Sequence, residues 1–137
     1  AVMAAEGRAT PATTLFAVAR QQASLAHRCR EMFTDVDAIL MPVLSSAPPP
    51  VGALALTGTS PSEHFAAMEA FAPNAALANV AGLPALALPF GVSGGLPLGV
   101  QLIGPPGADA ALLGLGGQIE TRAPVFSFPY PIAGLPT

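Results

Sequence analysis

The 137-residue chain is long enough for one domain with a hydrophobic core and too short for two. Its five Arg residues are scattered and its net charge is −3, which excludes the basic surface typical of nucleic-acid-binding proteins. Apolar residues make up 52% and charged residues only 9%, against about 25% charged residues in ordinary soluble domains. Such a chain exposes broad apolar patches when alone, so we expect a segment of a larger body rather than a hydrophobic but free-standing protein.

Pro and Gly interrupt every apolar stretch before it reaches the roughly 18 residues that a membrane-spanning helix needs. The first residues carry no basic region followed by an apolar one, unlike a signal peptide, so we expect a cytoplasmic protein without membrane contact. Because position 1 is not Met, we also expect a chain that begins partway through a longer one. The single cysteine, Cys29, excludes an internal disulfide.

The first predicted element is an amphipathic helix from about Pro11 to Phe33. Thr10 followed by Pro11 is typical of a helix N-cap and first helical residue. Residues at helical spacing form one face, on which Cys29 is expected to be a small core residue. The members of this face are Leu15, Val18, Gln22, Leu25, Cys29, Met32 and Phe33.

The next part of the chain predicts a strand and a surface loop. Residues 38–44 are short, continuously apolar and preceded by acidic residues, which indicates a buried strand. Pro42 restricts this strand to an edge of the sheet or places it at the strand's end. Residues 45–59 are rich in Pro, Gly, Ser and Thr and show no period, so we expect a loop over the surface.

Two short helices are predicted next. Ser60 and Glu63 form a capping-box sequence around a proline at the first helical position, which predicts a helix to about Phe71. Pro73 interrupts this helix, and a second one is expected over residues 74–81. Gly82 then provides the left-handed conformation that ends a helix.

A β-hairpin and a final helix complete the predicted elements. Two apolar runs, residues 84–90 and 98–104, flank a glycine-rich turn. Residues 108–120 predict a last helix, in which three glycines each cost about 1 kcal/mol relative to alanine. The tail from Ala123 is rich in proline and is expected to be extended and irregular.

Ser93 lies in a G-x-S-x-G string at residues 91–95, the pattern of a nucleophile elbow. That motif needs a strand before the serine and a helix after it, whereas a second apolar strand follows here. Both histidines, His27 and His64, also precede Ser93, which is the wrong order. We therefore interpret the string as a hairpin turn.

A thiol nucleophile with a histidine base is the second candidate. His27 and Cys29 are two positions apart on the predicted helix, so their side chains point to nearly opposite sides and cannot meet. The two His and eight scattered acidic residues match no metal-binding motif. The sequence therefore predicts no metal and no cofactor.

The most informative stretch, residues 79–101, reads NVAGLPALALPFGVSGGLPLGVQ and continues as LIG. It resembles the C-terminal pattern of the amidase signature hydrolases, N-x-x-G-x-P followed by an apolar strand, a glycine-rich turn and G-x-Q-x-x-G. Residues 33–42, FTDVDAILMP, are similar to the phrase F-x-x-x-D-x-[IL]-L-x-P of the same family. The ordered likeness covers Thr10 to Glu120.

This resemblance implies an α/β fold in which one mixed β-sheet is packed between helices. It also implies that residues 1–137 form a single segment, the C-terminal quarter to third of an amidase domain, without the catalytic N-terminal portion. The family uses a Ser-cisSer-Lys triad, for which Ser45 and Ser46 are the tempting match. The chain has no Lys, however, and lacks the family's Gly-Ser-Ser-Gly surroundings, so no residue receives a catalytic role.

The positions that match the family pattern are expected to be mainly structural: Gly82, Pro84, Gly99, Gln101 and Gly104. Gln101 is polar within an apolar run, so burial would require hydrogen-bond partners, and we expect it to tie the sheet to a neighbouring loop. In the family, the segment before Asn79 lines the acyl side of the substrate pocket. The resemblance therefore predicts substrate-binding roles for Phe65, Met68, Phe71, Ala72, Asn74 and Ala75.

One departure from the family pattern bears on the substrate. Relatives that make amidated tRNA place an acidic residue just upstream of this asparagine to hold an amino-acid ammonium group. The nearest position here is Ala72, and residues 71–79 contain no acid. This favours an apolar or aromatic amide over an amino-acid substrate.

Three functional hypotheses follow. The first is the C-terminal part of an amidase signature hydrolase of non-peptide C–N bonds, inactive by itself, whose partner is the absent N-terminal portion and whose substrate is a small-molecule amide. The second is a non-catalytic, amidase-like interaction module that docks on a partner or forms a homo-oligomer through its apolar surface. The third is a different chemistry at the hairpin that uses Ser93.

Overall fold

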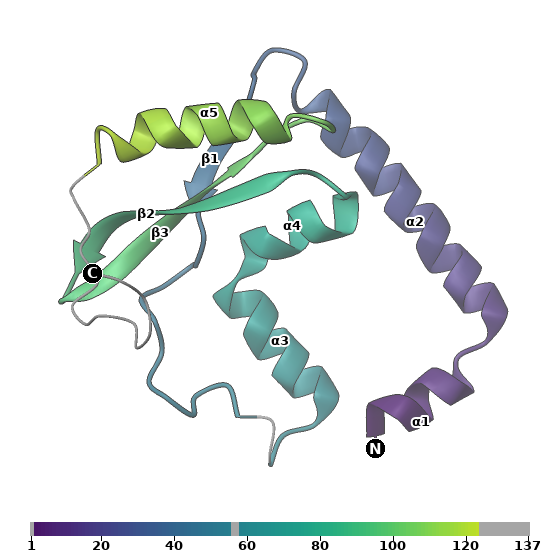
Figure 1. Ribbon diagram of the computed structural model, residues 1–137. Coiled ribbons are helices and arrows are strands. Elements are labelled where there is room, and N and C mark those ends of the chain that lie inside the picture. The colour runs from purple at the N-terminus through teal and green to yellow at the C-terminus, as the bar shows by residue number, and fades with distance from the viewer. Residues whose placement is uncertain (1, 56–57, 124–137) are drawn as a thin grey trace, which may run out of the picture.

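The computed structural model describes residues 2–55 and 58–123. Within these ranges the chain folds into helices that flank an antiparallel sheet (Figure 1), which confirms the predicted α/β class. The elements in chain order are α1 (Val2–Ala9), α2 (Ala12–Glu31), β1 (Ile39–Pro42), α3 (Pro61–Phe71), α4 (Pro73–Ala81), β2 (Ala85–Ser93), β3 (Leu96–Ile103) and α5 (Asp109–Glu120).

The sheet has the order β1-β3-β2, so β3 is the central strand. The predicted hairpin is confirmed as β2 and β3, and it turns through Gly94 and Gly95 with φ angles of 59° and 79°. A two-residue turn with two positive φ angles matches the twist of antiparallel strands, which explains the paired glycines. β1 lies at the opposite edge and ends at Pro42, as the missing N–H of proline requires.

One face of the sheet packs against α5. Leu88 of β2, Leu102 of β3 and Leu112 of α5 form a buried apolar cluster. Gly116 is buried against Leu86 of β2 and leaves no room there for a side chain. This close approach explains a glycine inside a helix that needs packing for its stability.

The other face carries a second cluster, formed with α2 and α4. Ile103 of β3 packs with Cys29 of α2, with Ala78 and Ala81 of α4, and with Leu83 beyond the end of α4. The predicted core position of Cys29 is confirmed, because only 3% of this residue is exposed. Figure 1 shows α5 above the sheet and α4 below it, and α2 contacts α4.

The start of α2 differs from the sequence prediction. The helix is preceded by Pro11, which makes no side-chain cap bond. The sequence predicts a cap at Thr10, but the Thr10 hydroxyl instead donates to the Glu6 carbonyl at 2.9 Å and closes the unpredicted helix α1. In the first half of α2, Leu15 and Val18 are exposed, so only the second half of the predicted apolar face meets the core.

The predicted capping box of α3 is confirmed. Ser60 accepts a hydrogen bond from the Glu63 N–H, and the Glu63 carboxylate accepts one from the Ser60 N–H at 2.9 Å. The Ser60 backbone N–H, and then the Ser60 hydroxyl, lower the pKa of the Glu63 carboxyl group. The α3 boundary therefore follows from local chemistry alone.

Helix α4 ends as predicted. Gly82 adopts a left-handed conformation with φ 65° and ψ 38°, and the Gly82 and Leu83 N–H groups both donate to the Ala78 carbonyl. These bonds satisfy a helix-end carbonyl while the chain turns toward β2. The tail beyond Ala123, predicted to be extended, lies outside the described residues.

Gln101 occupies the middle of the central strand, opposite Met41 on one side and Ala87 on the other. It is only 5% exposed, and its Nε2 atom has no hydrogen-bond partner among the described residues. Burial is thus confirmed, but the expected partner for this amide nitrogen is not found. By strand alternation the side chain shares a face with Ile103, in an apolar setting that offers few acceptors.

We expect Gln101→Met to raise the free energy of unfolding by about 1 kcal/mol, because it removes a buried donor whose desolvation is not compensated. Urea unfolding monitored by circular dichroism measures this change. Gln118→Met on the exposed surface of α5 is the matched control and should change stability by less than about 0.5 kcal/mol. A clear loss of stability in Gln101→Met alone would mean that the amide makes a stabilising bond.

Candidate functional site

A cavity of about 630 Å³ lies between the segment that follows β1 and the distal part of the β2–β3 hairpin. Its walls are largely apolar, and the side-chain hydroxyls on them belong to two serines, which suits an apolar ligand with few polar groups. The lining residues are Pro42, Val43, Leu44, Ser45, Ser46, Pro48, Ala87, Leu88, Pro89, Phe90, Gly91, Pro97, Leu98, Gly99 and Val100.

The six predicted substrate-binding residues lie together on α3, α4 and the junction between them. Phe65 and Met68 lie one turn apart on α3, and both are about half exposed. The other four are partly buried around the point where Pro73 breaks the helix, and they are Phe71, Ala72, Asn74 and Ala75. None of the six belongs to the lining of the cavity beside β1.

Hydrogen bonds connect this junction to the cavity wall. The Ser45 hydroxyl donates to the Ala70 carbonyl at 2.7 Å or the Phe71 carbonyl at 3.0 Å, and the Ser45 N–H also donates to the Phe71 carbonyl at 3.0 Å. On the other side, the Asn74 amide donates to the Pro42 carbonyl at 3.0 Å. The segment after β1 therefore lines the cavity and at the same time holds the α3–α4 junction.

The sequence did not indicate the role of Ser45 in this arrangement. In the sequence, the Ser45 hydroxyl is a candidate only as a nucleophile. A serine pair close to prolines does not indicate which distant carbonyl group the hydroxyl will bond. The available signal lay at Pro73, which interrupts the helix and so leaves the last carbonyl groups of α3 without the partners that a continued helix supplies.

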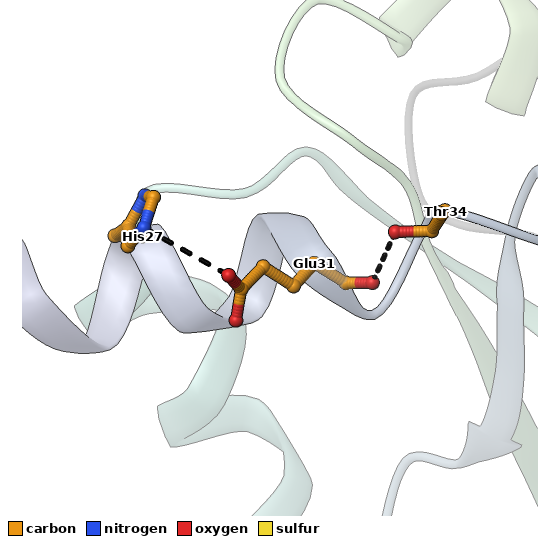
Figure 2. Close-up of polar contacts among 3 residues, drawn as sticks. All are labelled: His27, Glu31 and Thr34. Atoms are coloured by element: carbon orange, nitrogen blue, oxygen red, sulfur yellow. Dashed lines mark hydrogen bonds and ion pairs between the residues drawn. The ribbon is translucent and has the colours of Figure 1, made fainter.

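The structure separates the residues of the two alternative nucleophile sites. Ser93 ends β2 directly before the two-glycine turn, and β3 follows, so the strand-to-helix geometry of a nucleophile elbow is not present. Cys29 is buried in the core. His27 points along the exposed side of α2 toward Glu31, with 3.9 Å between Nε2 and Oε1, while Thr34 binds the Glu31 carbonyl (Figure 2).

Residues 2–55 and 58–123 contain no group of three His, Cys, Asp or Glu side chains that could hold a metal ion. No helix in the same part of the chain is long and apolar enough to cross a membrane.

These features define an α/β segment in which a β-hairpin borders an apolar cavity. The chain has no lysine that could activate a serine. The family model for amidases matches residues 2–113. The chain belongs to the amidase family.

The curated relatives are several times longer than this chain. A putative amidase from Synechocystis sp. is 42% identical over 87 residues, which cover 63% of this chain and 17% of that protein. The 2-amino-5-chloromuconic acid deaminase from Comamonas testosteroni is 36% identical over 90 residues, which cover 65% of this chain and 19% of that enzyme. The chain thus matches less than a fifth of the length of either relative.

Solved structures agree with the family assignment. A crystal structure of an amidase superposes with a TM-score of 0.69 at 28% identity, over 87% of this chain and 27% of that one. The structure of 6-aminohexanoate cyclic dimer hydrolase superposes with a TM-score of 0.70 at 25% identity, over 86% of this chain and 26% of that one. The fold described above therefore occurs in larger members of the family.

Proposed function

We propose that this chain is the C-terminal part of an amidase signature hydrolase that cleaves non-peptide C–N bonds of small amides. Its role is to supply scaffold and part of the acyl pocket, while the Ser-Ser-Lys triad lies outside these 137 residues. The observation that carries the proposal is the match of residues 2–113 to the amidase family in a chain without any lysine. A serine hydroxyl needs an adjacent base to become a nucleophile, and arginine cannot supply one.

The pocket wall in this proposal is the α3–α4 segment with Phe65, Met68, Phe71, Ala72, Asn74 and Ala75. Its support is twofold: the exposed Phe65 and Met68 offer apolar surface, and the junction is bonded directly to the segment that lines the apolar cavity. The absence of an acidic side chain over residues 71–79 favours an apolar or aromatic acyl group over an amino acid. A cytoplasmic location stays a prediction.

A chimera tests the proposal. The matching region of the putative Synechocystis amidase is replaced by residues 2–123 of this chain, and ammonia release from benzamide and hexanamide is measured beside the unmodified parent. We expect hydrolysis by the chimera and none above background by the isolated chain. Turnover by the isolated chain, or a folded chimera that has lost the activity of its parent, would refute the proposal.

The alternative is a non-catalytic interaction module that binds a partner or a second copy. It is favoured by the exposed apolar residues at the start of α2, which are Leu15, Phe16 and Val18. Light scattering coupled to size-exclusion chromatography measures whether the isolated chain forms a stable oligomer. An oligomer together with an inactive chimera supports the interaction module over the hydrolase.

A further inference from the structure

Helix α3 ends with backbone groups that its own sequence cannot satisfy. α3 ends at Phe71 and a new helix starts at Pro73, so the carbonyls of Ala70 and Phe71 lack the N–H partners from residues 74 and 75 that a continued helix provides. The Ala75 N–H, which a continued helix would direct to Phe71, donates to the Ala72 carbonyl instead. Partners for the two carbonyls must therefore come from another part of the fold.

Ser45 supplies them. Its hydroxyl and N–H lie within hydrogen-bond distance of these carbonyls, although the two segments are distant in sequence. Asn74, on the first turn of α4, makes the reverse connection to the carbonyl of Pro42 at the end of β1. We propose that Ser45 and Asn74 form a polar clasp that fixes the α3–α4 junction against the exit of β1 and so sets the width of the substrate pocket.

The clasp couples two parts of the proposed site. Pro42 and Ser45 line the apolar cavity, and the same two residues hold the junction that carries Phe71 and Ala72. A shift of the junction therefore moves the proposed acyl wall relative to the cavity. Ser45 and Asn74 act as positioning residues, and Asn74, besides its place in the proposed pocket wall, acts on the cavity through its hydrogen bond to the Pro42 carbonyl. This inference rests on the proposed function.

The neighbouring serine provides a comparison within the same segment. The Ser46 hydroxyl also lies on the cavity wall, but among the residues that the structure describes it bonds only to the adjacent Ala47 carbonyl, at 3.3 Å. Only one member of the serine pair therefore connects the cavity to the helices. The clasp therefore depends on the bonds from Ser45 to α3, and a serine hydroxyl on the cavity wall is not sufficient to form it.

The test uses the active chimera with Ser45→Ala, Asn74→Ala and the double variant, with Ser93→Ala in the hairpin as the matched control. We expect each single variant to raise KM for hexanamide about tenfold with kcat changed by less than about threefold, because loss of one positioning bond loosens binding without touching the triad. Ser93→Ala should leave both constants unchanged. A purely structural role would lower the active fraction and kcat while KM stayed constant.

The double variant provides a second criterion. If both side chains hold the same junction, the rise in KM of the double variant is smaller than the product of the single rises. Unchanged KM values in the single variants, or effects that multiply fully, would overturn the clasp.

Hydrogen exchange separates this inference from the proposed function. In the 137-residue chain, the Ser45 N–H donates to the Phe71 carbonyl, so its exchange rate reports on whether the junction stays closed. We expect Asn74→Ala to speed this exchange about tenfold, whereas Ser93→Ala leaves it unchanged. An inactive chimera together with the expected exchange result would refute the proposed function and keep the clasp. An unchanged exchange rate would refute the clasp alone.

Discussion

Leu102→Ala is expected to lower the free energy of unfolding by about 2–5 kcal/mol, more than any other substitution proposed for this chain. Leu102 lies in the central strand and is only 2% exposed, packed with Leu88 of β2 and Leu112 of α5. Removal of its side chain leaves a cavity between the sheet and α5, which these rigid elements cannot fill by collapse. A loss of this size is a large fraction of the roughly 5–15 kcal/mol that stabilises a typical domain.

Denaturant unfolding followed by circular dichroism measures this loss. Leu113→Ala is the matched control, because Leu113 follows Leu112 on α5 but is 66% exposed. Leucine and alanine both favour helices, so this control should change stability by about 0.5 kcal/mol or less. Equal losses in the two variants would contradict the packing of α5 on the sheet.

Gly82→Val is expected to destabilise the chain by about 1–3 kcal/mol, because valine would be forced into the left-handed conformation that ends α4. Gly82 has a φ of 65°, and no neighbouring atom of residues 2–55 and 58–123 lies within 4 Å of the position of an added Cβ. The cost is therefore conformational and not steric contact with other residues. Thermal unfolding of the two proteins under identical conditions measures it.

The control for this prediction is a glycine with ordinary helical geometry. Gly114 lies inside α5, where an added Cβ also meets no atom of the described part of the chain within 4 Å. Gly114→Ala should stabilise the chain by up to about 1 kcal/mol, since alanine is the better helix former. Destabilisation by both substitutions, or by neither, would contradict the assigned backbone conformations.

Elements governed by local chemistry were predictable from the sequence. The Ser60–Glu63 capping box, the glycine end of α4 and the two-glycine hairpin each depend on residues a few positions apart, and the structure confirms all three. The likeness of residues 79–104 to the amidase pattern led to the correct family. These features need no knowledge of what packs against them.

Features that depend on distant partners were harder to predict. Leu15 and Val18 lie in α2, as their helical spacing predicts, but both are exposed because only the second half of α2 packs against the core. Thr10 fits an N-cap by residue type, but its hydroxyl finds the Glu6 carbonyl of an unexpected helix. Sequence spacing indicates which side chains share a face, whereas only the tertiary fold determines whether another element covers that face.

The candidate site could also be predicted only in part. The resemblance placed six binding residues on the α3–α4 segment, and their contact with a substrate stays a prediction. The connection of that segment to Ser45 could not be predicted, because it joins groups brought together by the sheet.

The pairing of β1 with β3 has a consequence for how the chain folds. The hairpin joins neighbouring strands through two residues, whereas Ile39 of β1 must find Ile103 across nearly half of the chain. Closing this long loop costs more conformational entropy than closing the two-residue hairpin turn. We therefore expect β1 to pair with β3 after the hairpin has formed. The α3–α4 junction is hydrogen-bonded to the end of β1. It therefore reaches its final position only when β1 joins the hairpin.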